Sequence, residues 1–439
     1  MTFPKYESYK DSEVEWLGEI PSHWNIARLK TAVESSTNGI WGRDPDESRE
    51  DDGIICIRVA DFSRHKLLVS LDKLTRRKIS DSEFQSRKLI SGDLLLEKSG
   101  GGDNQLVGQV VLFEHNIPAV CSNFLARLRI RKDFSSRFLN YVNACLYFLR
   151  VNYKHIKQTT GIQNIDSSSY FSELFAFPDL EEQKKISNFL DRTTTDIDRA
   201  IAQKQCLIEL LQEQKVILIN QSVTKGLNPN TPMRDSEVRW IGEIPKHWEV
   251  WRSKRLFSQR KEFAQSDDIQ LSATQAYGVI PQEEYEDRIG RKVTKIFQHL
   301  EKRRHVEVGD FVISMRSFQG GLERAWAKGC IRSSYVVLKP SEKVDVDFFS
   351  YVFKSSVYIS ALQSTANFIR DGQDLNFDNF CAVDLALPPI EEQRAIAQTL
   401  DVAVANNSKV AECTKKEIDL LQEFRQIIIA NAVTGKIKV

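Results

Sequence analysis

Two long stretches of the chain carry apolar residues at three-, four- and seven-residue steps, which is the spacing of one face of an α-helix. The first stretch covers residues 178–226 and the second covers residues 388–439. In each, a proline and two glutamates precede the apolar stripe and a glycine lies near the end, as expected for the two ends of a helix. At 1.5 Å per residue each helix would be roughly 60–65 Å long. A single helix of this length cannot bury its stripe, so the pattern predicts that the two pair as a coiled coil.

The two helical stretches are also copies of one another. Residues 178–191 return as residues 388–401, at an offset of 210, and the offset holds without a gap to the end of the segment. A second duplicated segment opens each half of the chain, because residues 11–30 return as residues 235–254 with 13 of 20 positions identical. Two repeated segments in the same order indicate an internal duplication.

The duplication divides the chain into two globular and two helical segments: 1–177, 178–226, 227–387 and 388–439. Between the repeated markers lie inserts of 147 residues (31–177) and 133 residues (255–387), which scarcely resemble each other. We call the repeated segments on either side of the inserts the frame. The two copies of a frame keep similar sequences when they share their packing or their partner, whereas two inserts diverge when each has its own ligand. The predicted fold class is therefore α+β, with two globular α/β domains, two long helices and a pseudo-two-fold internal repeat.

Each globular segment opens with the pattern W-x-G-E-I-P-x-H-W, at residues 16–24 and 240–248, which we call the clasp segments. The histidines of these segments, His23 and His247, are candidates for catalysis or metal binding. However, no carboxylate or cysteine cluster accompanies them at the spacing of metal ligands. We therefore interpret them as packed histidines in a structural clasp, and predict neither a metal site nor a catalytic residue.

The composition is that of an ordinary soluble protein, with 41% hydrophobic and 28% charged residues. No uncharged apolar run approaches the roughly 20 residues of a membrane helix. The seven cysteines are scattered without a C-x-x-C pair, which predicts reduced intracellular thiols. The sequence contains no phosphate-binding loop, dinucleotide fingerprint, nucleophile elbow or zinc-protease motif, and these absences disfavour a free-standing enzyme.

A formal net charge of +1 argues, for the chain as a whole, against a nucleic-acid partner. The charge is nevertheless segregated. Residues 127–157 contain eight basic residues and one acid, and residues 288–305 contain seven basic residues and one acid. Locally basic stretches with interleaved aromatic residues suit contact with phosphate groups. The alternative, a solvated helix face and an ordinary alternating strand, stays open.

Loops that follow predicted strands offer a second set of candidates. Gly92-Asp93 and Gly309-Asp310 each enter a hydrophobic strand that leads into a polar, glycine-rich loop. Arginine in such loops suits guanine, and glutamine or asparagine suits adenine, although turn chemistry alone also explains these residue types. The candidate DNA-binding residues are Lys98, Ser99, Arg127, Arg129, Lys154, Lys157, Gln158, Gln163, Asn164, Lys292, Arg303, Arg304, Arg316, Ser317, Gln319, Arg370 and Gln373.

This arrangement resembles the DNA-specificity subunit of type I restriction–modification systems. The residues that carry the resemblance are the two clasp segments, the P-x-x-E-E-Q start of each long helix, and the glycine segments around Gly92, Gly309, Gly161 and Gly372. The resemblance implies a non-catalytic prokaryotic cytoplasmic subunit in which each globular domain reads one half of a split double-stranded DNA target. The two helices would form an antiparallel coiled coil that sets the spacing between the half-sites.

The resemblance also implies partners. Two methyltransferase subunits would dock on the helices and two translocase–nuclease subunits would complete the complex, with S-adenosylmethionine, Mg²⁺ and ATP bound by those partners only. The candidate partner-binding residues on the helical stripes are Ile186, Leu190, Leu211, Ile396, Leu400 and Leu421. The alternative from another functional class is a coiled-coil scaffold whose two inserted domains bind proteins.

Overall fold

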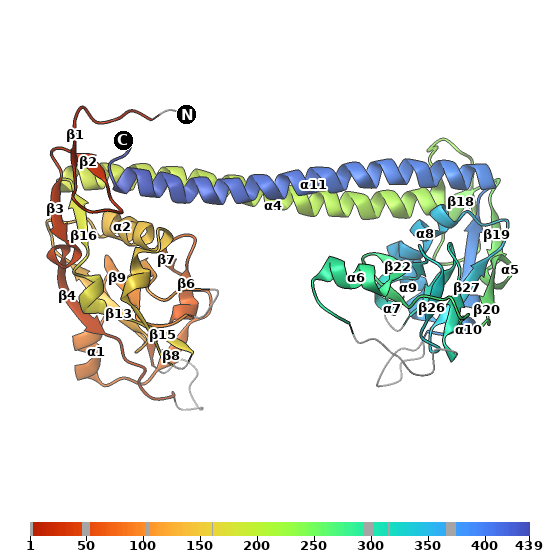
Figure 1. Cartoon of the computed structure of the whole chain (residues 1–439), viewed down its shortest axis with the longest axis horizontal. Helices are drawn as coiled ribbons and strands as arrows, with labels where there is room; N and C mark the ends of the chain where they lie inside the picture. Colours follow the sequence, from red (N-terminus) through yellow and green to blue (C-terminus); the bar gives the residue numbers. More distant parts are fainter. Residues whose placement is uncertain are drawn as a thin grey trace. The chain divides into compact units, whose positions relative to one another are not determined.

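The computed structural model of the chain describes residues 3–45, 53–101, 105–159, 161–293, 302–314, 317–365 and 375–439 (Figure 1). These residues form a mixed α/β structure that divides into two compact units. Unit 1 consists of Met1–Gln203 and Lys416–Val439, and unit 2 consists of Lys204–Lys415. Each unit therefore contains a part of both long helices, whereas the division predicted from the sequence assigned the helices to segments of their own.

The two predicted long helices are present, and their bounds agree with the prediction to within a few residues at most ends. Helix α4 spans Leu180–Lys225 and helix α11 spans Ile390–Val433. In unit 1 the first half of α4 and the last turns of α11 contribute to one hydrophobic core. In unit 2 the last turns of α4 and the first half of α11 contribute to another. These pairings are the ones that two antiparallel helices make.

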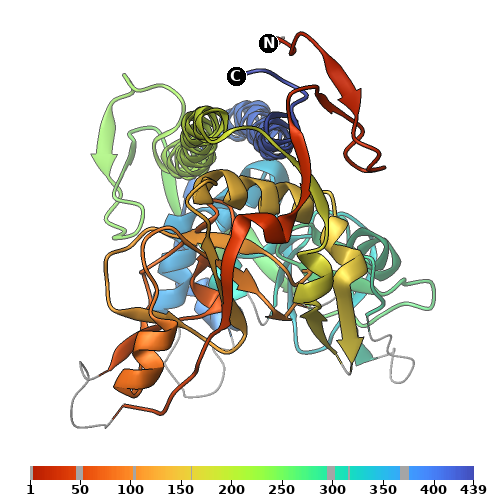
Figure 2. The same cartoon turned by 90° about the vertical axis from the view of Figure 1, so that its left-hand side faces the viewer.

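The main sheet of unit 1 has the strand order β4-β13-β9-β11-β7-β6. Its strands are β4 (Val33–Asn38), β13 (Leu125–Ile130), β9 (Asp93–Glu97), β11 (Val110–Phe113), β7 (Leu68–Val69) and β6 (Phe62–Ser63). Every residue of β9 is buried, because both faces of the sheet are covered. Leu94 and Leu96 lie in the core that contains helix α2 (Ser136–Phe148), and Leu95 lies in a second core on the other face. In Figure 2, where unit 1 faces the viewer, α2 lies between the sheet and the long helices.

Smaller elements surround this sheet. The other strands of unit 1 are β1 (Tyr9–Asp11), β2 (Glu19–Pro21), β3 (Asn25–Arg28), β5 (Ile54–Ile57), β8 (Thr75–Arg77), β10 (Ser99–Gly100), β12 (Ala119–Cys121), β14 (Ile156–Thr159), β15 (Ile162–Ile165) and β16 (Leu174–Phe177). Its short helices are η1 (Leu29–Ala32), η2 (Val59–Asp61), α1 (Asp81–Arg87), η3 (Val151–His155) and α3 (Ser167–Tyr170). The three strands β10, β15 and β14 form a small sheet of their own, and this sheet matters for the candidate DNA surface.

Unit 2 has a four-stranded sheet in the order β20-β27-β24-β25. The strands of unit 2 are β17 (Met233–Asp235), β18 (Glu243–Pro245), β19 (Glu249–Arg252), β20 (Phe257–Arg260), β21 (Leu271–Thr274), β22 (Gly278–Pro281), β23 (Arg304–Val306), β24 (Phe311–Ile313), β25 (Glu323–Arg324), β26 (Gly329–Ile331), β27 (Val336–Pro340) and β28 (Asp384–Leu387). Its short helices are α5 (Ser253–Leu256), α6 (Gln282–Ile289), α7 (Ser317–Gly320), α8 (Val346–Lys354), α9 (Ser356–Ser364) and α10 (Phe377–Cys381). Phe257, Phe311 and Phe353 pack edge to face in its core, with ring centroids 4.9–5.9 Å apart.

The duplicated segments make the same contacts in both units. Strand β1 pairs with β2 and strand β17 with β18 in the same antiparallel register, at positions 224 residues apart. In unit 1 the side-chain amide of Gln183 donates to the carbonyl of Pro178 and accepts from the backbone N–H of Ser135, at the start of α2. In unit 2 Gln393 makes the corresponding two bonds, to Pro388 and to Asp345 at the start of α8.

The clasp segments hold the ends of the long helices. Trp24 and Trp248 are fully buried. His23 Nε2 lies 2.9 Å from the Glu182 carboxylate in the first turn of α4, and His247 Nε2 lies 2.7 Å from that of Glu392 in α11. The structural clasp is therefore confirmed. The expectation that the histidines are packed is wrong, because about half of each side chain is exposed.

Glycine is required where α11 ends against the clasp of unit 1. Gly435 has a φ of +72°, and a Cβ there would lie 2.4 Å from the Pro21 ring and 3.3 Å from Trp24. Both the backbone conformation and the close approach exclude a larger residue without rearrangement. The predicted helix end at this glycine is therefore confirmed, with packing as well as conformation as its cause.

Four of the predicted partner-binding residues belong to the core of the chain itself. Ile186 and Leu190 on α4, and Ile396 and Leu400 on α11, have no exposed surface. They pack against the globular part of their own unit, so the prediction that they contact a partner is wrong. Leu211 and Leu421 are partly buried. No helix in the described parts of the chain is both long and apolar enough to cross a membrane.

The burial of the helix stripe predicts unequal effects for two leucines of unit 1. Leu190→Ala removes a fully buried side chain and should lower the unfolding free energy by about 2–5 kcal/mol. Leu420→Ala, the matched control on α11, removes a side chain that is 63% exposed and should change it by less than about 0.5 kcal/mol. Denaturant unfolding of the full chain measures both. Equal effects of the two substitutions would contradict the assigned packing.

Candidate nucleic-acid and partner interfaces

The small sheet of unit 1 brings together candidates from two distant segments of the sequence. Strand β10 pairs with β15 and places Ser99 opposite Asn164, while β14 pairs with β15 and places Gln158 opposite Gln163. Lys98 precedes β10, and its carbonyl accepts a hydrogen bond from the backbone N–H of Ile165. The structure therefore confirms that these candidates lie close together, whereas their contact with DNA stays a prediction.

Exposed cationic and amide groups lie on strand β14 and in helix η3, which precedes it. Lys154, Lys157 and Gln158 are exposed. Lys157 forms an ion pair of 2.7 Å with Asp166, and Lys154 forms one of 2.9 Å with Glu173. The Lys157–Asp166 pair is open to solvent and weak in water, so Lys157 can exchange its carboxylate partner for a phosphate at little cost. The Glu173 carboxylate is 11% exposed and also bonds to His155, so it keeps a partner when Lys154 turns to a phosphate.

Three candidates in unit 1 make internal polar contacts. The side chain of Gln163 is buried, and its Oε1 accepts a hydrogen bond of 3.1 Å from the backbone N–H of Val107. Arg127 is buried and donates to the Lys88 carbonyl and to Thr37. Arg129 makes an ion pair of 3.1 Å with the buried carboxylate of Asp93. The prediction that Gln163 and Arg127 face DNA is wrong, because both side chains are buried. Arg129 is 30% exposed, so its contact with DNA stays a prediction.

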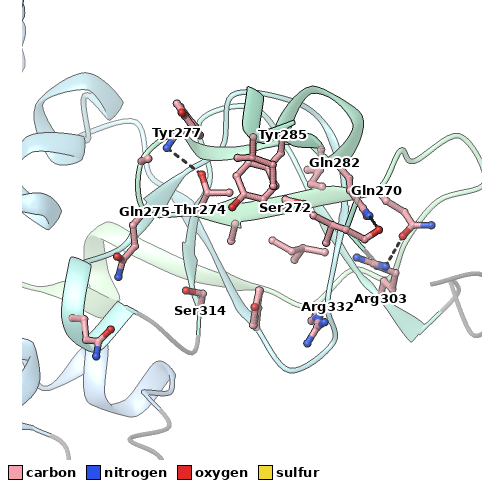
Figure 3. Close-up of a pocket in the computed structure, with 18 residues that line it drawn as sticks. Gln270, Ser272, Thr274, Gln275, Tyr277, Gln282, Tyr285, Arg303, Ser314 and Arg332 are labelled. Atoms are coloured by element: carbon pink, nitrogen blue, oxygen red, sulfur yellow. Dashed lines mark hydrogen bonds between the residues drawn. The ribbon is translucent and has the colours of Figure 1, made fainter. Parts of the chain in front are cut away.

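Unit 2 has a pocket of about 940 Å³ (Figure 3). Strand β21, helix α6, the chain after β26 and the residues next to β23 and β24 line it. The described lining contains tyrosine, arginine, glutamine and hydroxyl side chains and no acidic residue. In Figure 3, Tyr285 and Gln282 extend from α6 on one side of the pocket, and Arg332 and Ser314 lie on the opposite side.

Arg303 is the most constrained group of the pocket. It is 8% exposed, and its Nη1 donates a hydrogen bond of 3.0 Å to Gln270. Its Nε has no hydrogen-bond partner, and no carboxylate of the described residues forms an ion pair with it. Arg304, one residue further, donates to the Lys261 carbonyl and covers the ring of Phe263, so it lies outside the pocket.

The other candidates of unit 2 are either exposed or buried in a structural role. Lys292 is exposed, and Gln319 on α7 is exposed and lines the pocket. Ser317 is fully buried, and its hydroxyl accepts a hydrogen bond from the backbone N–H of Ser314, so it is a structural residue and not a DNA contact. The candidates that lie outside the described residues are Arg316, Arg370 and Gln373.

Several lining residues of the pocket were missed by sequence reasoning. Tyr277, Tyr285 and Arg332 belong to three different elements and share no motif. Only the fold brings them together, so no signal in the sequence singled them out.

A second surface consists of apolar residues that the long helices leave exposed. Leu210 and Ile217 on α4, in unit 2, are 56% and 47% exposed. Leu420 and Ile427 on α11, in unit 1, are 63% and 46% exposed. Seven residues separate the members of each pair, which places them on one helix face. The two pairs lie 210 residues apart, so the constant offset of the repeat was the signal for them.

No family model matches the sequence. Curated relatives do match. One, provisionally named the type I restriction enzyme MjaX specificity subunit of Methanocaldococcus jannaschii, is 26% identical over 448 residues, which cover 100% of this chain and 99% of the relative. The MjaVIII specificity subunit of the same organism is 23% identical over 475 residues, covering 100% and 98%. By sequence, the chain is similar over its whole length to proteins named as type I specificity subunits.

Solved structures agree with this relationship at the level of fold. The crystal structure of the HsdS subunit from Thermoanaerobacter tengcongensis has a TM-score of 0.54 and 15% identity, and covers 95% of this chain and 98% of that one. A chain from a study of assembly and conformational transition of the type I R-M system has a TM-score of 0.64 and 14% identity, covering 94% and 98%. The names of these relatives agree with the prediction of a specificity subunit that is not itself an enzyme.

The specificity-subunit homologue contains an acidic group that titrates near neutral pH. Glu323 on β25 is almost fully buried, and Lys354 Nζ donates to its carboxylate at 2.7 Å and to the carbonyl of Gly320 in α7 at 2.9 Å. Burial raises the pKa of Glu323 to about 7, although the Lys354 ammonium acts in the opposite direction. The pair fixes one end of α7, the helix that brings Gln319 to the pocket.

This titration predicts a pH-dependent stability. The folded chain keeps a proton on Glu323 up to a pKa of about 7, and the unfolded chain only up to 4.5, so folding is favoured at low pH. The contribution of Glu323 is complete below pH 4.5 and is lost as the pH rises through 7. Glu323→Gln should therefore reduce the fall in thermal unfolding midpoint between pH 5 and pH 8, whereas the exposed control Glu243→Gln should not. An unchanged difference in the Glu323 variant would contradict the assignment.

Proposed function

We propose that the chain is the DNA sequence-recognition subunit of a type I restriction–modification complex of the prokaryotic cytoplasm, and that each unit reads one half of a bipartite target. The observation that carries the proposal is similarity over the full length to proteins named as specificity subunits. The duplicated frame with two different inserts supports it, because two inserts that read different half-sites diverge while the frame that positions them does not.

In unit 1 the proposed DNA surface lies around strand β14 and the end of η3. Lys154 and Lys157 supply charge for phosphate contact, and Asn164, which pairs with Lys157 and so lies on the same face of the sheet, supplies an amide group of the kind that reads adenine. Gln158 is exposed on the opposite face of β14. In unit 2 the proposed surface includes the rim of the pocket, where Arg332 and Gln319 are exposed. Lys292 adds a further exposed cation.

The long helices are proposed to set the spacing between the two half-sites. Helix α4 has 46 residues and α11 has 44, so each rises roughly 65–70 Å along its axis. One turn of DNA is about 34 Å, and readers of two half-sites bind a whole number of turns apart. Each helix is continuous through both units of the chain, which supports its use as a spacer.

The exposed apolar pairs on the same helices are proposed to bind two methyltransferase subunits. Exposed apolar residues at regular spacing mark protein contacts. Because Leu210 and Ile217 correspond to Leu420 and Ile427 in the repeat, the chain offers the same surface twice, which fits two identical partners. Translocase–nuclease subunits complete the proposed complex, and the partners supply S-adenosylmethionine, ATP and Mg²⁺.

The proposal predicts the methylation pattern of the host genome. Deletion of the gene should remove methylation at one bipartite motif and leave every other methylated motif unchanged, because specificity is lost while other methyltransferases are intact. Restoring the gene should restore the motif. Genome-wide methylation mapping measures this, and a methylome that is identical with and without the chain would contradict the function.

The docking surfaces predict partner stoichiometry. Leu420→Asp/Ile427→Asp should leave one methyltransferase copy bound, Leu210→Asp/Ile217→Asp should leave the other, and the combined variant should bind none. Val216 on α4 is 46% exposed but lies about a third of a turn away from Ile217, so Val216→Asp is the matched control and should keep both copies. Native mass spectrometry of the co-expressed complex counts the copies. Two copies on the combined variant would exclude these surfaces as docking sites.

A further inference from the structure

The shape of the unit 2 pocket restricts what it can bind. Protein elements that read base edges inside a DNA groove are convex, because they must enter the groove. A pocket instead receives a group that projects into it, and its volume of about 940 Å³ is in the range of small-ligand sites. A base within an intact duplex does not project, whereas an extruded nucleotide or a free nucleotide does.

The lining fits the parts of a nucleotide. Tyr277 and Tyr285 pack edge to face with ring centroids 6.4 Å apart, and the Arg288 guanidinium covers the Tyr277 ring, so Tyr285 is the ring that offers a flat face on which a base can stack. The exposed amide group of Gln319 matches the hydrogen-bonding edge of a base. The described lining contains no carboxylate, so no wall of the pocket repels a phosphate.

Arg303 is the independent sign of a ligand. A guanidinium that is 8% exposed is costly to bury without a negative partner, and its only side-chain hydrogen bond within the described residues goes to the neutral Gln270. A phosphate oxygen or the acceptor edge of guanine in the pocket would give this guanidinium the partner that it lacks among the described residues.

We propose that this pocket binds a single nucleotide, with the base against the Tyr285 ring and with Arg303 and Arg332 on its anionic or acceptor groups. The nucleotide is either a base extruded from the DNA target or a free nucleotide. Binding of an extruded base rests on the proposed function, whereas binding of a free nucleotide does not.

The test uses the full chain and two probes. The first is titration calorimetry with each of the four deoxynucleoside 5′-monophosphates. The second is fluorescence of the mapped target duplex, carrying 2-aminopurine at each position of the half-site in turn, on addition of the chain assembled with its methyltransferase. Arg332→Met is the main variant, because this side chain is exposed and forms no hydrogen bond or ion pair with the described residues, so its loss removes no polar contact of the fold. Arg255→Met, also exposed in unit 2 but outside the pocket, is the matched control.

Binding of a free nucleotide that weakens about tenfold or more in Arg332→Met, and is unchanged in Arg255→Met, supports the proposal with a free ligand. A rise in 2-aminopurine fluorescence at one position, lost in Arg332→Met only, supports it with an extruded base. If neither the calorimetry nor the fluorescence shows a response, the nucleotide pocket is overturned. This holds even if deletion of the gene still removes a methylated motif and the proposed function stands. If that deletion changes nothing, the calorimetry alone decides, since it needs no DNA target.

Discussion

A buried glutamine in the first turn of each long helix is the contact on which the arrangement of each unit depends. Gln183 and Gln393 are both 1% exposed. Each amide donates to a carbonyl before its own helix and accepts from the backbone N–H of the residue that caps the helix covering the sheet, Ser135 before α2 or Asp345 before α8. Loss of the side chain would leave buried polar groups without partners, which costs about 1–3 kcal/mol for each group. The P-x-x-E-E-Q sequence is therefore a connector between the sheet layer and the long helix, with its second glutamate bound to the clasp histidine.

Because the frame fixes the sheet layer, the inserts can differ without loss of the fold. The buried aspartate that follows a glycine illustrates this. Asp93 pairs with Arg129 from β13, whereas Asp310 pairs with Arg260 from β20. The buried charge is neutralised in both units, but by an arginine from a different strand. Two inserts that satisfy the same internal requirement with different residues leave their outer surfaces free to carry different ligands.

The duplicated frame could be predicted from the sequence, whereas the residues exposed on the surface of each unit could not. The long helices were predictable because apolar periodicity and helix-end residues agree over more than forty residues. The direction of a single polar side chain was not, because Arg127 and Gln163 find acceptors on segments far away in the chain. The apolar stripe was also ambiguous, since the same helical spacing holds the fully buried Leu190 and the partly exposed Leu211. The pocket of unit 2 was not predictable, because its walls come from elements that only the fold brings together.

The central claim is that the frame is common to both halves and that each insert alone specifies what its half recognises. The most direct measurement replaces residues 255–387 by a second copy of residues 31–177 within the frame of unit 2, and maps the methylated sites of cells that carry the chimera. The account predicts a symmetric motif in which both halves equal the half-site of unit 1. A folded, methyltransferase-bound chimera that still methylates the original asymmetric motif would contradict it.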